Sequence, residues 1–209
     1  MAIGKLRGLR MKCYLIRHAA TKGNLEHRYV GRTEESVLPQ ELHRLRRLGE
    51  SLSSVEYVFT SPSLRCRQSA EALFQDRGLF PAVEIISGFQ EMDFGQFEYK
   101  NYQELNGNPE YQDYIDSGGK IAFPGGEAPK AFQMRCKNAF VSCIKKAKGQ
   151  QRQSIAFVVH GGTIMAVMEA FGNPPKGYFD YQVKNGCGYL AVAEEKPILQ
   201  LVHIQQIGL

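Results

Sequence analysis

Apolar positions along the chain alternate between short β-branched runs and longer stretches with helical spacing. The runs at Cys13–Arg17, Tyr57–Thr60 and Ser154–His160 are bounded by polar or small residues, as is typical of buried strands in a parallel sheet. Leucines at positions 42, 45, 48 and 52 are spaced three, three and four residues apart, which predicts a helix over 41–53. Strands that alternate with helices favour a layered α/β fold with a mostly parallel central sheet.

The remaining segments extend this alternation. Ser61-Pro62-Ser63 places a serine cap and a proline at the start of a helix that we expect to run to about Asp76 and to close at Gly78. Residues 19–38 and much of 88–126 are expected to be loop. Further predicted elements are a strand at Val83–Ile86, a short helix near 108–116, a long helix from Gly125-Gly126-Glu127 to about Gly149, a helix at 162–171, and an antiparallel pair of strands at Tyr189–Ala193 and Leu199–Ile204.

Length and composition indicate one folded domain. The chain has 209 residues, 43% hydrophobic and 22% charged, which is ordinary for a globular protein. We expect residues 1–10 to form a disordered basic extension and residues 11–209 to form the domain. No apolar run has the length of a membrane span, and the first ten residues lack the apolar region of a secretory signal. We therefore expect a cytoplasmic protein without a membrane partner.

Charge and cysteine content restrict the partners further. The net charge of +5 suits an anionic ligand, but the basic residues form no continuous stripe, so we expect no nucleic acid partner. The five cysteines are irregularly spaced and include no Cys-x-x-Cys pair. This pattern indicates buried thiols in a reducing compartment rather than a zinc site or a redox dithiol.

Two histidines follow predicted strands that lie far apart in the sequence. His18 comes after Arg17, and His160 precedes Gly161-Gly162. The carboxyl ends of parallel strands meet at one edge of a sheet, so both histidines are candidates for one site. A guanidinium suits phosphate, and a neutral imidazole next to a cation can act as a nucleophile. His160 could bind phosphate as an imidazolium or hydrogen-bond the nucleophile; alternatively, either ring only packs at the sheet edge.

Two other segments carry charged side chains that could take part in the same site. Arg65 falls in the first turn of a predicted helix, where a cation is unfavourable unless an anion binds there. The loop that carries Glu91 and Asp93, with Glu98 close behind, offers carboxyl groups for general acid catalysis. Surface arginines and solvated loop carboxylates remain the simpler alternatives for each segment taken alone.

Four motifs in this order resemble the histidine phosphatase (phosphoglycerate mutase-like) superfamily. They are Leu15-Ile16-Arg17-His18 with Thr21 and Asn24, Thr60-Ser61-Pro62-Ser63-Leu64-Arg65, Glu91-Met92-Asp93-Phe94-Gly95, and Val159-His160-Gly161-Gly162. The resemblance implies a three-layer α/β/α fold and phosphoryl transfer through a phosphohistidine on His18. It also implies that Glu91 protonates the leaving group, that Arg17, Arg65 and His160 stabilise the transferred phosphoryl group, and that no metal or other cofactor is needed.

The same comparison with the family gives candidate substrate-binding residues. It also shows two departures from the family pattern. We count Asn24, Gly161, Arg32 and Tyr99 as candidate substrate contacts. Ala19 stands where the family usually has glycine, and costs about 1 kcal/mol if that position requires a positive φ; we expect activity to be retained. Tyr99 also replaces a usual glycine and is expected to narrow the mouth of the site.

The segment 96–126 should cover the site and select the substrate. It is rich in aromatic residues, and Phe123-Pro124-Gly125-Gly126-Glu127 resembles a segment of bacterial α-ribazole phosphatases of cobalamin synthesis. We expect a small-molecule phosphate ester as partner, with a flat group stacked on these rings. The sequence leaves open a core-forming role for the aromatic residues, a broad-specificity phosphatase, mutase-type phosphoryl transfer, a non-catalytic relative that binds a phosphorylated ligand, and assembly as a homodimer.

Overall fold

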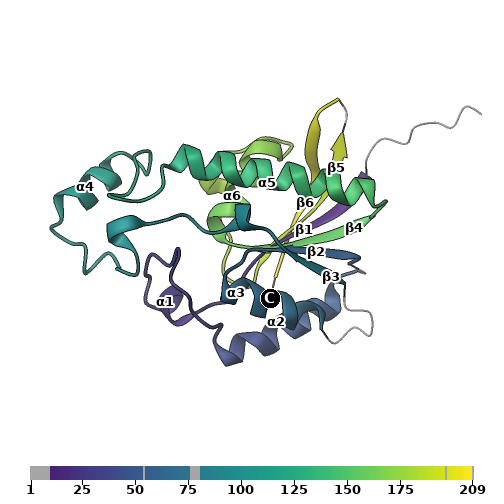
Figure 1. Ribbon diagram of the computed structural model, residues 1–209, viewed down its shortest axis with the longest axis horizontal. Coiled ribbons are helices and arrows are strands. Elements are labelled where there is room, and N and C mark those ends of the chain that lie inside the picture. Colours follow the sequence, from purple (N-terminus) through teal and green to yellow (C-terminus); the bar gives the residue numbers. More distant parts are fainter. Residues whose placement is uncertain (1–9, 54, 76–80, 196, 209) are drawn as a thin grey trace, which may run out of the picture.

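A central sheet organises the computed structural model, which describes residues 10–53, 55–75, 81–195 and 197–208 (Figure 1). Within these residues the sheet has six strands in the order β3-β2-β4-β1-β5-β6. The strands β1 to β4 run parallel, and β5 and β6 form an antiparallel edge. Their bounds are β1 Arg10–Arg17, β2 Tyr57–Thr60, β3 Ala82–Ile85, β4 Ser154–Val159, β5 Gly188–Glu195 and β6 Leu199–Ile207.

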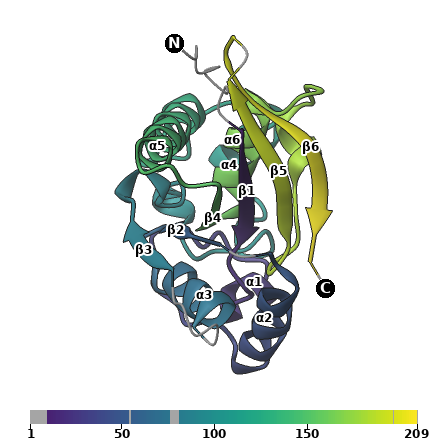
Figure 2. The same ribbon diagram turned by 90° about the vertical axis from the view of Figure 1, so that its right-hand side faces the viewer.

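Helices cover both faces of the sheet (Figure 2). One face carries α2 (Pro39–Ser51) and α3 (Leu64–Phe74), which pack on each other, and the opposite face carries α5 (Pro129–Gly149) and α6 (Gly161–Phe171). Two shorter helices, α1 (Lys22–Leu25) and α4 (Pro109–Asp116), lie in the connections. The architecture is therefore the predicted three-layer α/β/α fold with a mostly parallel sheet.

The alternation of side chains along β1 shows why both faces must be covered. Cys13 and Leu15 belong to the apolar cluster formed with α5 and α6, whereas Tyr14 and Ile16 belong to the cluster formed with α2 and α3. Successive side chains of a strand point to opposite faces, so a strand that is apolar at every position needs two apolar layers. Every residue of the neighbouring β4 is buried for the same reason.

The observed boundaries differ modestly from the predicted ones. β1 starts at Arg10, inside the expected extension, because Arg10 to Lys12 pair with β5; residues 1–9 lie outside the described residues. The helix predicted at 41–53 spans 39–51, with a proline in its first turn. The helix α3 ends at Phe74, and the predicted end at Asp76 and Gly78 lies outside the described residues. The short helix α1 was not expected within the loop 19–38.

The segment 96–126 packs its own small core. Phe97, Leu105 and Phe123 are buried together, and the rings of Tyr114 and Phe123 stack with centroids 4.2 Å apart. The core-forming role left open for these aromatic residues is thus correct for Phe97 and Phe123. Tyr102 is exposed.

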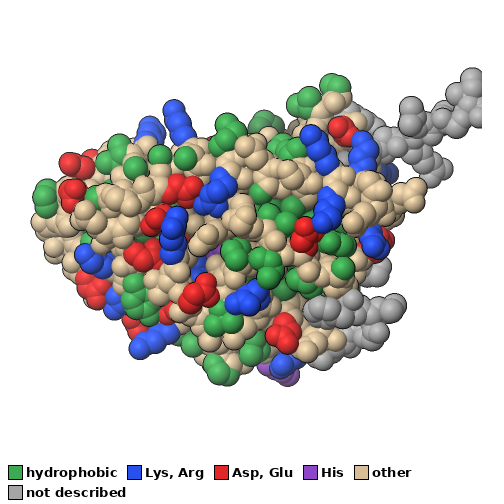
Figure 3. All heavy atoms as spheres, in the orientation of Figure 1, with side chains coloured by type: hydrophobic (Ala, Val, Ile, Leu, Met, Phe, Trp, Pro, Cys, Tyr) green, Lys and Arg blue, Asp and Glu red, His purple; other side chains and the backbone are tan. Residues whose placement is uncertain are grey.

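The surface charges, the helices and the cysteines can each be described from the structure. On the face drawn in Figure 3, basic and acidic side chains are intermixed rather than gathered in one stripe. Among the described residues, no helix is both long and apolar enough to span a bilayer. All five cysteines are buried free thiols.

Candidate active site

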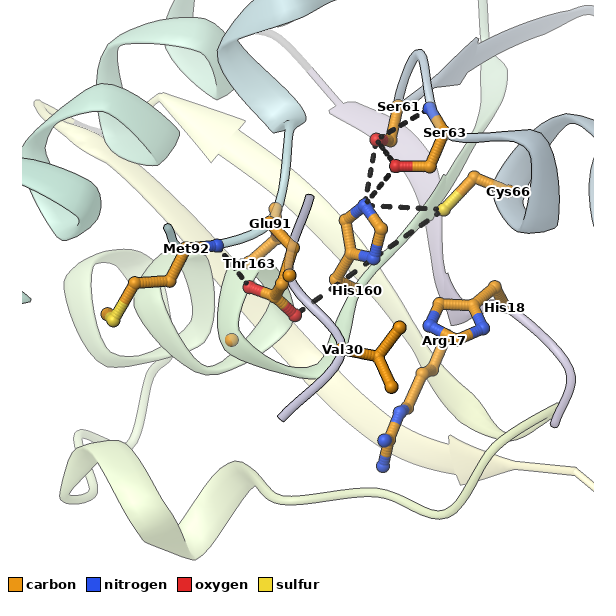
Figure 4. Close-up of polar contacts among 12 residues, drawn as sticks. Arg17, His18, Val30, Ser61, Ser63, Cys66, Glu91, Met92, His160 and Thr163 are labelled. Atoms are coloured by element: carbon orange, nitrogen blue, oxygen red, sulfur yellow. Dashed lines mark hydrogen bonds and ion pairs between the residues drawn. The ribbon is translucent and has the colours of Figure 1, made fainter. Parts of the chain in front are cut away.

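The two histidines meet at the carboxyl edge of the sheet. Arg17 at the end of β1 is in register with Val159 at the end of β4, so the residues that follow, His18 and His160, become neighbours. Their rings pack edge to face with centroids 5.2 Å apart. Figure 4 shows them beside Arg17 and Glu91. The predicted convergence of two distant segments on one site is therefore observed.

The hydrogen bonding of His18 selects one tautomer. Its Nδ1 lies 2.7 Å from the carbonyl oxygen of Ala19, and a carbonyl can only accept, so Nδ1 carries the proton and donates. The lone pair is then on Nε2. Burial, followed by the positive charges of Arg65 and Arg17, holds the pKa of His18 well below 6.5. The structure thus provides a neutral imidazole with Nε2 free to attack, which is the state that a nucleophile requires.

Ala19 fits its position without backbone strain. It is absent from the residues with positive φ, so the cost considered for a left-handed backbone does not arise. Its side chain is fully buried in the cluster beneath α2 and α3, and its N–H donates to Ser69 Oγ at 3.0 Å. The methyl group therefore belongs to the core.

The guanidinium groups of Arg65 and of the partly buried Arg17 approach the histidines from different elements. Arg65, fully buried in the first turn of α3, donates through Nη1 to Thr33 O at 2.9 Å and through Nη2 to Gly31 O at 2.7 Å and Val30 O at 3.2 Å. Arg17 donates through Nη1 to Val183 O at 2.8 Å. The Nε–H groups of both arginines are buried and have no hydrogen-bond partner among the described residues. Because an unsatisfied buried donor is costly, the pair is suited to an anion.

A short loop carries the carbonyl groups that hold Arg65. The N–H groups of Gly31 and Thr33 donate to Glu98 Oε1 at 3.0 and 2.9 Å, and the Thr33 hydroxyl donates to the same oxygen at 2.7 Å. Glu98 therefore holds the loop whose carbonyl groups bind Arg65. This geometry does not favour Glu98 as the proton donor.

The hydrogen-bond partners of His160 include two serine hydroxyl groups that the sequence did not identify as partners. Its Nε2 lies 2.8 Å from Ser61 Oγ and 3.3 Å from Ser63 Oγ, and its Nδ1 faces Arg65 Nη2 at 3.4 Å. A guanidinium can only donate, so Nδ1 accepts and Nε2 carries the proton. Burial, then the charge of Arg65, holds the pKa of His160 well below 6.5. This direction favours the neutral ring. His160 makes no hydrogen bond with His18 among the described contacts, and its role toward a phosphoryl group stays a prediction.

Glu91 has the environment of a general acid. Burial raises the pKa of Glu91 above 4.5, opposed by a hydrogen bond from the Met92 N–H at 3.0 Å and by weaker effects of Arg65 and Arg17. Its Oε2 lies 4.0 Å from His160 Nδ1. A Cβ on Gly162 would lie 2.7 Å from Glu91 Oε1, so glycine at the start of α6 makes room for the carboxyl group.

The other loop residues have different partners. Asp93 accepts from the Gly95 N–H at 2.9 Å and pairs with Arg32 at 3.2 Å. The Arg32 side chain is 61% exposed. Arg32 is therefore not brought into the cluster, and its contact with substrate stays a prediction.

Asn24 and Gly161 lie next to Arg17. The Asn24 side chain lines a cavity of about 690 Å³ together with Arg17, and its Oδ1 accepts from Asn185 Nδ2 at 3.1 Å. A Cβ on Gly161 would meet the Arg17 guanidinium at 3.4 Å, so the guanidinium lies over the start of α6. Asn185 also donates to His18 O at 3.2 Å, and no sequence motif pointed to it.

The backbone conformation at Tyr99 is one that favours glycine. Its φ is +60°, in the left-handed region. The hydroxyl donates to Glu35 Oε1 at 2.8 Å, and Arg28 lies 5.0 Å above the ring. Tyr99 lines neither cavity beside the cluster. The structure therefore does not bring Tyr99 to the site, and the expected narrowing of the mouth is not observed at these cavities.

A second cavity opens on the Glu91 side of the cluster. It has a volume of about 410 Å³ and an apolar lining. The aromatic and thioether side chains that line it are Met92, Phe94, Tyr114, Phe132, Met165, Tyr178 and Phe179. Lys120 and Lys130 also line it. An apolar group bound here would lie directly beside the Glu91 carboxyl group.

No group of three or more His, Cys, Asp or Glu side chains within the described ranges is arranged to hold a metal ion. The positive charge at the site comes from the two arginines. Together with His18, this arrangement is suited to binding an anion such as a phosphoryl group at the edge of an α/β sheet.

Comparison with known proteins gives the family. The sequence pattern of the histidine phosphatase superfamily (branch 1) matches residues 13–203, and the chain belongs to this superfamily of enzymes. It is 24% identical over 204 residues to the adenosylcobalamin/α-ribazole phosphatase of Escherichia coli (strain K12), covering 95% of this chain and 98% of that protein. It is 25% identical over 165 residues to a broad-specificity phosphatase of Saccharomyces cerevisiae, covering 76% and 69% of the two chains.

A solved structure shows the same fold. The α-ribazole phosphatase of Shigella flexneri superposes with a TM-score of 0.76 at 23% identity, covering 91% of this chain and 94% of the other. The resemblance expected from the four motifs is confirmed at the level of family and fold.

Proposed function

We propose that this enzyme hydrolyses small phosphate monoesters through a phosphohistidine formed on Nε2 of His18. In the first step Nε2 attacks phosphorus, the bond between phosphorus and the ester oxygen breaks, and Glu91 gives its proton to the leaving oxygen. In the second step water attacks the phosphohistidine, the N–P bond breaks, and the Glu91 carboxylate accepts the proton of the water. Inorganic phosphate and the alcohol are the products, and His18 and Glu91 regain their starting states.

The single observation that carries this proposal is the pair of buried Nε–H groups on Arg17 and Arg65 that lack partners among the described residues. Both guanidinium groups lie close enough to His18 to lower its pKa. The oxygens of a phosphoryl group attacked by His18 would accept these two hydrogen bonds. Charge-assisted bonds of this kind stabilise the negative charge that the transition state spreads over the equatorial oxygens. No step requires a metal ion in this mechanism.

The apolar cavity beside Glu91 supports a particular kind of leaving group. Because the acid must reach the leaving oxygen, the alcohol part of the ester would occupy that cavity. Aromatic walls suit a flat, apolar group, as in α-ribazole 5′-phosphate, and the relatives named for that substrate agree with this choice. A broad-specificity phosphatase is the second candidate, supported by the yeast relative. We place the enzyme in the cytoplasm, where its five free thiols stay reduced.

The test is a hydrolysis assay with EDTA present, using α-ribazole 5′-phosphate, p-nitrophenyl phosphate and simple sugar phosphates. His18→Ala is the control variant, and rapid quenching followed by phosphohistidine detection reports the intermediate. We expect turnover that survives EDTA, disappears in His18→Ala, and is fastest for α-ribazole 5′-phosphate.

Other outcomes separate the alternatives. Equal turnover of all esters would favour the broad-specificity phosphatase. Transfer of the phosphoryl group to a second alcohol rather than to water would indicate a mutase. Saturable binding without turnover, in protein with a normal thermal unfolding transition, would contradict hydrolysis and indicate a phospho-ligand binding protein.

A further inference from the structure

An ion pair on α5 and the segment before it contacts the loop that carries Glu91. Arg135 binds Glu127 in a bidentate manner, with Nε to Oε1 at 3.0 Å and Nη2 to Oε2 at 2.7 Å. The remaining amino group of Arg135, Nη1, donates to Gly88 O at 3.0 Å and to Gln90 O at 2.8 Å. Gln90 directly precedes Glu91, so Arg135 holds the backbone at the entry to the acid.

The backbone of Glu127 also holds the loop beyond the acid. The N–H of Glu127 donates to Asp93 O at 2.9 Å. Gln90 and Asp93 flank residues 91 and 92, so both sides of this short stretch are hydrogen-bonded to one Arg–Glu unit. The Arg135 guanidinium lies 5.2 Å from the centre of the Phe132 ring, and Phe132 packs against the Gly162 position next to the Glu91 carboxyl group.

We propose that the Arg135–Glu127 pair is a positioning device that fixes Glu91 at the distance from which it protonates the leaving oxygen. This inference rests on the proposed function, since it assigns a role only within that reaction. A general acid must lie within hydrogen-bond reach of the atom it protonates, so a small shift of the loop is enough to impair it. The pair does not contact His18, and the nucleophile and the anion site are held by other elements.

Because different contacts hold the acid loop and the anion site, we expect loss of the Arg135–Glu127 pair to impair one step of the reaction selectively. Arg17 and Arg65 are fixed by carbonyl groups of Val183 and of the loop 30–33, which the Arg135–Glu127 pair does not contact directly; the loops that hold Arg65 and Glu91 meet through the Arg32–Asp93 pair, in which Arg32 is 61% exposed. Loss of the pair should therefore leave attack on phosphorus intact and weaken proton delivery. An ester with a good leaving group needs little protonation, whereas an alkyl ester depends on it. A purely structural role would instead lower both rates together.

The experiment compares two esters of similar shape, p-nitrophenyl phosphate and 2-(4-nitrophenyl)ethyl phosphate. Arg135→Lys keeps the charge but loses the two-pronged contact with Glu127 that sets the guanidinium in place, and Glu127→Gln removes the charge that orients the Arg135 guanidinium toward the two carbonyl groups. Lys146→Gln is the matched control, because Lys146 also lies on α5 and binds a carboxylate, Glu84, at 2.7 Å.

We expect Arg135→Lys and Glu127→Gln to lower kcat/KM for the alkyl ester about tenfold or more, and for the aryl ester by about threefold or less. Lys146→Gln should change neither. In a Glu91→Gln background, Arg135→Lys should cause no further loss for the alkyl ester, because the group it positions is already disabled.

Each other outcome contradicts the inference. Parallel loss for both esters would assign Arg135 a general structural role, and unchanged alkyl turnover would show that Glu91 needs no such support. If Arg135→Lys lacks a cooperative unfolding transition, that variant is not folded, and the ratio of the two ester rates in Glu127→Gln then tests the inference. A wild-type enzyme that hydrolyses neither of these esters nor α-ribazole 5′-phosphate would overturn the proposed function itself, and with it this role for the ion pair; that result is visible before any variant is made.

Discussion

Replacing Glu98 with alanine tests the support of the anion site. In the wild-type structure one carboxylate oxygen of Glu98 accepts three hydrogen bonds, from the N–H groups of Gly31 and Thr33 and from the Thr33 hydroxyl. Glu98→Ala removes all three and releases the loop whose carbonyl groups hold Arg65. The variant should therefore lose both stability and affinity for the phosphoryl group.

The magnitude follows from the geometry. Hydrogen bonds to a charged group contribute about 1.5–3 kcal/mol each, but bonds that share one oxygen are not additive. The second oxygen, Oε2, is buried without a partner among the described residues, so its removal offsets part of the loss. We expect a net loss of about 2–3 kcal/mol in the free energy of unfolding, which lowers Tm by about 4–12 °C for a domain of this size.

Denaturant titration, thermal unfolding and kcat/KM for both esters check this expectation. Glu98→Ala should lower kcat/KM for the two esters by the same factor, because the anion donors move and the acid does not. Glu104→Ala is the control, since the Glu104 carboxylate also accepts several hydrogen bonds but is exposed, and it should leave Tm unchanged. A normal Tm with loss confined to the alkyl ester would refute this reasoning and make Glu98 the acid.

Two further predictions concern the acid and the nucleophile. His18, with a pKa well below 6.5, becomes protonated only as pH falls through that lowered value, and Glu91, with a pKa above 4.5, loses its proton as pH rises through the raised value. The pH profile of kcat/KM for an alkyl ester should therefore have an acidic limb from His18 and an alkaline limb from Glu91, and Glu91→Gln should remove the alkaline limb; a limb that persists would assign it to another group. Gly162→Ala places a Cβ 2.7 Å from Glu91 Oε1 and should lower alkyl ester turnover about tenfold. Gly149→Ala is the control, because there is open space around its Cβ, and it should have no effect. Equal turnover in the two variants would show that the Glu91 carboxyl group adapts to the added methyl group.

Local patterns in the sequence were sufficient for the elements and the central site residues. The apolar runs predicted β1, β2 and β4 because a strand buried on both faces must be apolar throughout. His18 and His160 could be assigned to one site because parallel strands end at the same edge. The helix boundaries were less accurate, since capping contacts and strand pairing extend or shorten an element by a few residues.

The partners of the site residues could not be predicted in this way. Ser61 and Ser63 were read as the start of a helix, yet the Ser63 side chain makes no capping bond, and both hydroxyls face His160. Asn185 reaches His18 from far along the chain. Such contacts join segments about 100 or more residues apart and leave no spacing in the sequence that identifies them.

The sequence by itself determined the family, the layered fold and the candidate side chains for the chemistry, because strand and helix periodicity and four ordered motifs are local properties of the chain. The tertiary structure decided which nitrogen of His18 is free, which arginine N–H groups have no partner among the described residues, which loop carboxyl group is buried beside His160, and which ion pair binds the backbone of its loop. Each of these depends on hydrogen-bond partners and on burial, and both arise only when distant segments are packed together.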